Sequence, residues 1–206
     1  MRTTTLIVLT VALSLLNIGC DSTSSRDAVF YNNRGLDYYD QGELNKAIAD
    51  LTKAISLDPQ LDAAYNNRGL AYTDQGELDK AIVDYNKAIE LAPADAITYN
   101  NRGEAYRNQG ELDKAIADYN KAISLDPQLA MAYNNRGLAY YHQGELNKAI
   151  VDYNKAISLD PQLAMAYNNR GLAYYNQGEL NKALVDYNKA ISLDPQLDAA
   201  YNNRGL

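Results

Sequence analysis

The chain has 206 residues, a net charge of −7 and a single cysteine, and its prolines recur at equal intervals from Pro59 to Pro195. One cysteine excludes an internal disulfide framework and a cysteine-rich zinc site. The negative charge gives no support for nucleic-acid binding, which requires clustered positive charge on the protein. The regular spacing argues against an irregular globular enzyme, so we expect no catalytic residues and no cofactor.

Residues 1–19 are predicted to be an export signal rather than part of the fold. Arg2 supplies a positive charge, and the apolar stretch from Leu6 to Ile18 is shorter than the roughly 20 residues of a membrane span. The stretch ends at Gly19, just before Cys20, and resembles a bacterial lipoprotein signal, in which cleavage precedes a cysteine that is then lipidated. The alternative is an ordinary signal peptide or an uncleaved short anchor, with Cys20 incidental.

Residues 20–27 would then comprise the lipidated Cys20 and a short flexible tether, because residues 21–27 are polar and rich in serine. The resemblance implies a protein that is exported and anchored as a lipoprotein in the bacterial cell envelope. The alternative is a soluble protein that is secreted or periplasmic.

From Ala28 onward the sequence repeats one pattern at a fixed period. Each unit carries Y-x2-R-G-x2-Y and then A-x3-[LY]-x2-A-x4-P. This period, with its order of aromatic, glycine, alanine and proline residues, resembles the tetratricopeptide repeat, and the resemblance covers residues 28–206. The complete units are residues 28–61, 62–95, 96–129, 130–163 and 164–197, and a sixth unit begins after them.

The residues of unit one predict a helical hairpin without reference to the family. Tyr31, Gly35 and Tyr38 lie at i, i+4 and i+7, which is one face of a first helix. Gly42 can adopt the turn conformation that separates this helix from a second amphipathic helix. Pro59 ends the second helix because proline disfavours helical geometry in the residue before it.

One hairpin cannot bury both of its apolar faces, so neighbouring hairpins must stack. We therefore predict an all-α fold, a right-handed α-solenoid of stacked antiparallel helical hairpins. The short sixth unit, residues 198–206, is expected to leave the apolar end of unit five exposed. This end implies either a truncated reading frame or a surface that another molecule covers.

An arginine precedes the first glycine of every unit, and every complete unit has an aspartate in its second helix. We predict that the two pair across the hairpin, as in Arg102 with Asp118, because an unpaired charge near the helix contact would be costly. The alternative pairs the aspartate with a lysine three residues further on, as in Asp50 with Lys53.

The resemblance implies that the first helices line a concave groove that holds an extended peptide. Paired asparagines in each first helix could bind a peptide backbone as donor and acceptor, or they could merely solvate the helix. Variable residues on the same side would give specificity, with Glu104 and Arg107 forming a charged patch in unit three. The predicted peptide-binding residues are Asn32, Asn66, Asn100, Asn134, Asn168, Leu70, Glu104, Arg107, Leu138, Tyr141, Leu172 and Tyr175.

Chemistry-bearing motifs are otherwise missing from the sequence. His142 is the only histidine, and its counterparts in the other units are polar turn residues, so we expect a solvated side chain rather than a general base. We predict no catalytic, metal or cofactor site. The expected function is that of a non-enzymatic, membrane-tethered scaffold that binds an extended peptide segment of a partner protein. The alternative is an assembly protein that self-associates through uncapped repeat ends.

Overall fold

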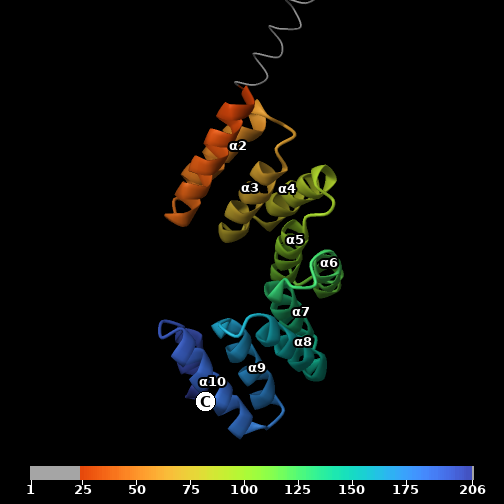
Figure 1. Ribbon diagram of the computed structural model, residues 1–206, viewed down its shortest axis with the longest axis vertical. Helices are drawn as coiled ribbons and strands as arrows, with labels where there is room; N and C mark the ends of the chain where they lie inside the picture. The colour runs from red at the N-terminus through yellow and green to blue at the C-terminus, as the bar shows by residue number, and fades with distance from the viewer. Residues whose placement is uncertain (1–23, 206) are drawn as a thin grey trace, which may run out of the picture. The chain divides into compact units, whose positions relative to one another are not determined.

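The computed structural model describes residues 24–205, which are helical and contain no β-strand. The predicted signal segment at residues 1–19 and the lipidation site Cys20 lie outside the described residues. The predicted fold class, all-α with stacked antiparallel helical hairpins, is confirmed (Figure 1). The first described helix covers residues 24–40. It is followed by α2 (Leu44–Leu57), α3 (Asp62–Asp74), α4 (Leu78–Leu91), α5 (Ala96–Asn108), α6 (Leu112–Leu125), α7 (Ala130–His142), α8 (Leu146–Leu159), α9 (Ala164–Asn176), α10 (Leu180–Leu193) and α11 (Asp198–Arg204).

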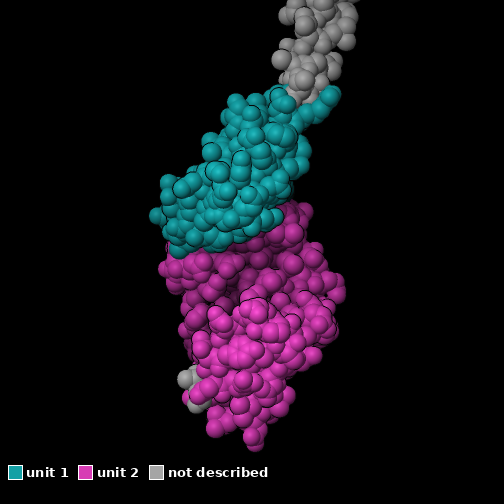
Figure 2. All heavy atoms as spheres, turned by 90° about the vertical axis from the view of Figure 1, so that its left-hand side faces the viewer, with its two compact units in different colours: residues 1–93 teal, residues 94–206 magenta. Residues whose placement is uncertain are grey.

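The helices divide between two compact units, shown in different colours in Figure 2. Unit 1, residues 1–93, contains hairpin 1 (residues 24–40 with α2) and hairpin 2 (α3 with α4). Unit 2, residues 94–206, contains hairpin 3 (α5 with α6), hairpin 4 (α7 with α8), hairpin 5 (α9 with α10) and the short helix α11. Inside unit 2 the first helices α5, α7 and α9 pack against one another in order.

Each hairpin turns at a glycine with positive φ, as the sequence predicts. In hairpin 2, Gly76 has a φ of +78° and its N–H donates to the Thr73 carbonyl. The next N–H, from Glu77, reaches back to the Tyr72 carbonyl at 2.9 Å. These two bonds form the Schellman motif, which satisfies the last carbonyls of a helix and requires the left-handed conformation that glycine tolerates.

The second helices end two residues before proline, which also agrees with the prediction. Asp58, before Pro59, leaves the helix with φ −137° and ψ 93°. The Asp58 carboxylate accepts a hydrogen bond from the Gln60 N–H at 3.0 Å, which stabilises the link to the next hairpin. The connection is therefore short and defined, and it brings successive hairpins into contact.

The core of each hairpin depends on a glycine in the first helix facing a large side chain in the second. A Cβ atom on Gly69 would lie 2.6 Å from the ring of Tyr85, and one on Gly103 would lie 2.7 Å from Tyr119. Those tyrosines are fully buried, together with alanines such as Ala81 that let the helices approach closely. The tyrosine ring therefore fills the space that glycine leaves between the two helices.

The first helix begins before the predicted boundary at Ala28. Residues 24–27, expected in the tether, are helical, and the Ser24 hydroxyl donates to the Leu57 carbonyl at 2.9 Å. Ala28 is fully buried, so this extra turn continues a packed helix. A serine-rich composition predicted flexibility, but contact with the end of α2 stabilises helical structure here.

Candidate functional site

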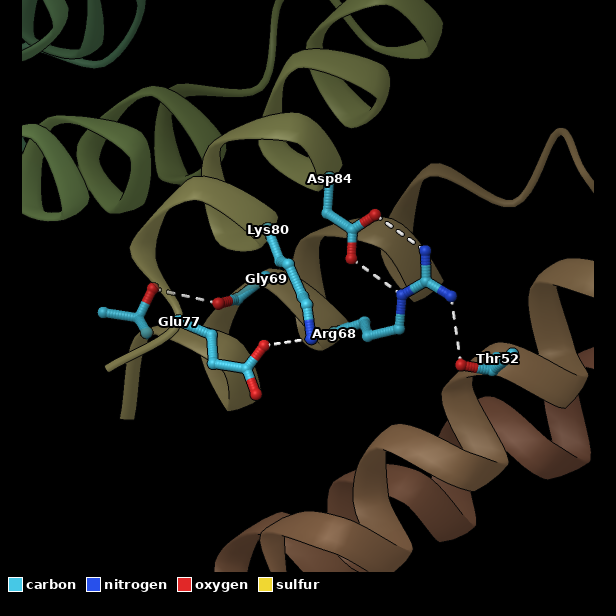
Figure 3. A network of polar contacts seen from close by, with 7 residues as sticks. Thr52, Arg68, Gly69, Glu77, Lys80 and Asp84 are labelled. Carbon is cyan, nitrogen blue, oxygen red and sulfur yellow. Dashed lines mark hydrogen bonds and ion pairs between the residues drawn. The ribbon is translucent and has the colours of Figure 1, made fainter. Parts of the chain in front are cut away.

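The repeated arginines form the most regular polar network in the described part of the chain. In hairpin 2, the Nε and Nη2 atoms of Arg68 donate to the two carboxylate oxygens of Asp84, both at 2.7 Å (Figure 3). The predicted pairing across the hairpin is confirmed in all five hairpins, and the lysine alternative is not needed. The pairs are Arg34–Asp50, Arg68–Asp84, Arg102–Asp118, Arg136–Asp152 and Arg170–Asp186.

A third bond of these arginines was not predicted from the sequence. Arg68 Nη1 donates to the Thr52 hydroxyl of hairpin 1 at 3.0 Å, and Arg136 Nη1 donates to Asn120 Oδ1 of hairpin 3 at 2.6 Å. Two tyrosines of its own helix also flank the Arg136 guanidinium. Each such arginine joins its own hairpin to the preceding one, so it belongs to the scaffold rather than to a ligand site.

The predicted peptide-binding residues all lie on first helices, at positions i, i+4 and i+7 of one helical face. We call this surface the first-helix face. In unit 1 its predicted members are Asn32 on the helix at residues 24–40, and Asn66 and Leu70 on α3. In unit 2 they are Asn100, Glu104 and Arg107 on α5, Asn134, Leu138 and Tyr141 on α7, and Asn168, Leu172 and Tyr175 on α9.

The asparagines of this face bond to one another and form a ladder between hairpins. Asn169 Nδ2 donates to Asn134 Oδ1 at 3.1 Å, Asn134 Nδ2 donates to Asn135 Oδ1 at 3.3 Å, and Asn135 Nδ2 donates to Asn100 Oδ1 at 3.1 Å. The ladder extends at one end to Asn101 and at the other through Asn168 to Asn203. In unit 1, Asn67 donates to Asn32 at 2.9 Å.

The ladder gives the asparagines a structural role that neither sequence alternative included. Asn134 is 2% exposed and Asn100 is 6% exposed, so they do not simply solvate the helix. Asn134 and Asn135 each use one N–H and one oxygen lone pair on neighbouring asparagines, which leaves one of each. The second asparagine of each pair, such as Asn135, contributes to the ladder as much as the first. Its recurrence in every repeat was the sequence feature that could have indicated this role.

The residues that differ between hairpins surround the ladder on the same face. Leu70, Leu138 and Leu172 are half-buried, as are Tyr141 and Tyr175. The hydroxyl of Tyr141 accepts a hydrogen bond from Asn176 Nδ2 of the next hairpin. The same leucine and tyrosine are present in hairpins 1, 4 and 5, whereas hairpin 2 has Thr73 in place of the tyrosine.

Hairpin 3 replaces these apolar residues with an ion pair. Arg107 Nη2 donates to Glu104 Oε1 at 3.1 Å, within one turn of α5. The Arg107 side chain is 17% exposed, whereas that of Glu104 is 41% exposed. The sequence predicted this charged patch, and the structure brings the two residues together as a pair.

Buried tyrosines of the second helices lie beneath the variable positions. The hydroxyl of Tyr85 lies 3.1 Å from the Thr73 hydroxyl of α3. Among residues 24–205, by contrast, the hydroxyls of Tyr119, Tyr153 and Tyr187 lack a hydrogen-bond partner. Burial raises the pKa of all three, to about 12 for Tyr187, so they remain protonated donors at neutral pH.

His142 lies exposed at the last residue of α7, the turn-proximal place that the sequence predicts. Partial burial and then the positive charge of Arg107 lower its pKa below the ordinary histidine value. His142 therefore lies within the electrostatic reach of the hairpin 3 patch, which the sequence did not indicate.

The opposite side of the hairpins carries shallow hollows of a repeated type. One of about 340 Å³ is bordered by Arg136, Tyr140 and Val151, and Val151 is 65% exposed. Its charged groups are already paired within the hairpin, as Lys148 is with Glu145. Residues 24–205 contain no group of three metal-binding side chains. In the same range, no helix has both the length and the apolarity needed to cross a bilayer.

Together, the stacked hairpins and their variable face define a helical-repeat scaffold. A family model for the TPR repeat matches residues 35–76, 69–110, 103–144 and 137–178, and one for the tetratricopeptide repeat matches residues 164–197. The chain therefore belongs to the tetratricopeptide repeat family. Proteins of this family are protein-interaction scaffolds, and those with a similar fold are mostly non-enzymatic scaffolds or adaptors.

Solved structures agree with the family assignment. The chain is 31% identical to MamA, with 79% of this chain and 95% of MamA covered and a TM-score of 0.66. It is 24% identical to YrrB, described as a TPR protein with an unusual peptide-binding site, with 87% and 93% covered and a TM-score of 0.63. For PilF of Pseudomonas aeruginosa the identity is 19%, the coverage 88% and 90%, and the TM-score 0.74. The last two likenesses show the fold alone. No curated protein matches this chain.

Proposed function

We propose that this protein is a membrane-tethered scaffold that binds an extended segment of a partner protein on its first-helix face. The observation that carries the proposal is the contrast between residue types on that face. The asparagine ladder and the arginine pairs recur in every complete hairpin. The two positions beside them are leucine and tyrosine in hairpins 1, 4 and 5, but leucine and threonine in hairpin 2 and glutamate and arginine in hairpin 3. A surface whose frame is constant and whose exposed chemistry varies is suited to recognition.

The geometry of stacked helices supports an extended ligand. Neighbouring first helices in a packed array lie about 8–10 Å apart, and an extended peptide advances about 3.3 Å per residue. About three peptide residues would therefore span one hairpin. Leu138 and Leu172 on successive first helices would contact residues about three apart in the bound segment, with Tyr141 and Tyr175 beside them.

The asparagines would contribute less to the binding of the peptide than their number suggests. Asn134 already donates to Asn135 and accepts from Asn169. Only its remaining N–H and lone pair are left for a backbone amide, and the residue is 2% exposed. We therefore assign most of the contact to leucine and tyrosine side chains, whose burial would provide the larger favourable free energy.

Partner capture by the full chain tests this function. The chain, purified with its native membranes and cross-linked, should retain a defined protein, and Leu138→Glu with Leu172→Glu should reduce its recovery at least about tenfold. Hairpin 3 already has Glu104 at this position, so the substitution is compatible with the fold.

A matched control uses the opposite side of the same hairpin. Val151→Ala changes an exposed residue to the one that hairpin 3 has at the same place, Ala117. It should leave partner recovery unchanged. Equal recovery by the leucine variants and the parent chain would contradict binding on the first-helix face.

The membrane tether is the second element of the proposal and is supported by the sequence alone. The apolar segment that ends at Gly19 and Cys20 fits a lipoprotein signal. The chain would then be anchored in the cell envelope. Cys20→Ser should abolish incorporation of a labelled fatty acid and release the protein from membranes, and unchanged labelling would refute lipidation.

Self-association is a second candidate function. Val29 and Phe30 in hairpin 1 are 44% and 56% exposed, and Leu180 and Val185 in hairpin 5 are 55% and 67% exposed. Exposed apolar side chains of this size favour contact with another protein surface. Sedimentation across a hundredfold concentration range tests it, since a monomer at all concentrations would exclude assembly through these residues.

A further inference from the structure

Hairpin 1 exposes an apolar patch on its first helix, the helix at residues 24–40. Val29 is 44% exposed and Phe30, the only phenylalanine of the chain, is 56% exposed. They lie three and four residues after Arg26, which is also exposed, so the three share one face of the helix. We call Val29 and Phe30, with Arg26 beside them, the hairpin 1 patch.

Neighbouring side chains hold the Phe30 ring at the surface. The ring meets that of Tyr31 edge to face, with 5.5 Å between the two centroids. The Arg34 guanidinium lies over both rings, 5.3 Å from the Phe30 centroid and 5.0 Å from the Tyr31 centroid. Arg34 is itself paired with Asp50 of α2. The ring therefore has a defined orientation before anything binds it, which lowers the entropy cost of binding.

Two residues of this face exclude another hairpin of the same repeat as the surface that covers it. In hairpin 4 the corresponding positions are Ala132 and Ala139, which are fully buried against hairpin 3. Hairpin 1 has Phe30 and Asp37 at these positions. A stacked hairpin would have to fit a phenylalanine ring where a methyl group fills the space, and it would bury the charge of Asp37. The covering surface must therefore adapt to a ring and leave Asp37 in water.

The patch lies a short distance along the chain from the proposed lipid anchor. Three residues separate Cys20 from Ser24, and a segment of this length spans at most about 14 Å. The Ser24 hydroxyl donates to the Leu57 carbonyl of α2, so the start of the helix is fixed to the hairpin. From Ser24 to Phe30 the helix rises about 9 Å. A lipid on Cys20 would therefore keep Phe30 within about 23 Å of the anchored residue.

We propose that the hairpin 1 patch binds the lipid bilayer that holds the acyl anchor, with Val29 and Phe30 inserted at the level of the lipid headgroups. The inference rests on the proposed membrane tether and adds a second contact to it. A bilayer surface adapts to an inserted aromatic ring, as a packed hairpin does not. Two contacts also restrict the rotation that a single short tether would allow, so unit 1 would leave the membrane in a defined direction.

The contact would be driven by apolar area rather than by charge. Asp27 lies next to Arg26, and Arg34 is already paired with Asp50, so the patch carries little net charge. Two inserted side chains give weak binding by themselves, but the anchor keeps them at a high effective concentration beside the surface. We therefore expect the contact to form on zwitterionic as well as anionic lipids and to persist at high salt.

Tryptophan fluorescence tests the proposal directly, because the chain has no tryptophan of its own. The full lipidated chain with Phe30→Trp is purified from membranes and reconstituted into phosphatidylcholine vesicles with brominated acyl chains, since bromine quenches tryptophan on contact. An interfacial side chain lies about 5–10 Å into the boundary of headgroups and acyl chains, so the fluorescence should fall at least about twofold relative to unbrominated vesicles. Val83→Trp, at a residue that is 66% exposed in hairpin 2, is the matched control and should change little.

A second pair of variants shows whether Val29 and Phe30 themselves make the contact. Arg26→Trp places the probe on the same helical face and leaves the two apolar residues unchanged. Its fluorescence should be quenched with the native patch, and the quenching should be lost when Val29→Ala and Phe30→Ala are added. These two substitutions copy Ala63 and Ala64 of hairpin 2, so the fold should tolerate them.

The outcomes separate this inference from the proposed tether. A chain that incorporates labelled fatty acid at Cys20 but shows no lipid quenching of the Phe30→Trp variant would overturn the membrane contact and leave the tether standing. Equal quenching of Arg26→Trp with and without the alanine substitutions would do the same. Protection of the Phe30→Trp variant from aqueous acrylamide without quenching by lipid would assign the patch to a protein surface instead. Labelling that Cys20→Ser leaves unchanged would refute the tether and this inference with it.

Discussion

Hairpin 1 and hairpin 4 have nearly the same residues, yet their environments differ. Arg34 in hairpin 1 has a side chain that is 42% exposed, whereas that of Arg136 in hairpin 4 is 19% exposed. Phe30 is 56% exposed, and its counterpart Ala132 is fully buried. Hairpin 4 has hairpins 3 and 5 on its two sides within unit 2. The same motif therefore becomes a buried ion pair or a half-exposed one according to its neighbours.

This difference matters because the value of an ion pair depends on its burial. A buried pair that loses one partner leaves an uncompensated charge, whereas an exposed charge is solvated by water. Hairpin 4 should therefore be more sensitive to substitution than hairpin 1 at equivalent positions.

The largest difference in stability between hairpin 4 and hairpin 1 is expected when the aspartate of the ion pair is replaced. Asp152→Ala should reduce the free energy of unfolding by about 3 kcal/mol, because it leaves the partly buried Arg136 with only Asn120 as a polar partner. Asp50→Ala should lower the free energy of unfolding clearly less, since Arg34 is more exposed. Urea denaturation of the two variants measures both, and equal losses would contradict a role for burial.

The close-packing glycine should show a smaller contrast. A Cβ atom at residue 137 would lie 2.8 Å from the rigid ring of Tyr153, so Gly137→Ala should lower the free energy of unfolding by about 2 kcal/mol. In hairpin 1 the added methyl group meets Leu51 instead. Gly35→Ala should be tolerated better because leucine can change rotamer, and thermal unfolding of the pair would reveal the order.

Removal of a buried tyrosine hydroxyl should change the free energy of unfolding in opposite directions in hairpin 4 of unit 2 and hairpin 2 of unit 1. Tyr153→Phe removes a buried unpaired hydroxyl and should raise the free energy of unfolding by about 1 kcal/mol. Tyr85→Phe in hairpin 2 loses the contact with Thr73 and should lower it by a similar amount. Destabilisation by both variants would show that Tyr153 has a partner in solution.

The smallest effect is expected from His142. Burial and the Arg107 charge lower its pKa in the folded state, so the unfolded chain binds a proton more readily as the pH falls below about 6.5. The stability should decrease slightly from that pH down to the folded-state pKa. His142→Asn, which copies the residue at 176, should remove this dependence in urea unfolding at pH 7.5 and 5.5.

The sequence predicted most of the frame of the candidate site, because the frame repeats. The positions of the turn at Gly76, of the break at Pro59 and of the pair between Arg68 and Asp84 all follow from local geometry or from a fixed separation along the chain. Each requirement recurs in every complete repeat, so the pattern was visible without a structure.

Contacts between hairpins were harder to predict. Asn135 bonds to Asn100, 35 residues away, and Arg136 bonds to Asn120, 16 residues away in another hairpin. Neither of these separations along the sequence follows from the helical period, since both contacts depend on how two hairpins stack. For the same reason asparagines expected to face a ligand were found bonded to each other.

The sequence by itself determined the class of fold, the turn within each hairpin and the pairing of charges within each hairpin, because these depend on short-range geometry that the repeat imposes five times. Only the tertiary structure decided which identical residues are buried and which donors are left without a partner. Burial and hydrogen bonding depend on packing, so only the structure showed that the hydroxyl of Tyr85 meets Thr73 of its own hairpin whereas those of Tyr119 and Tyr153 meet no partner.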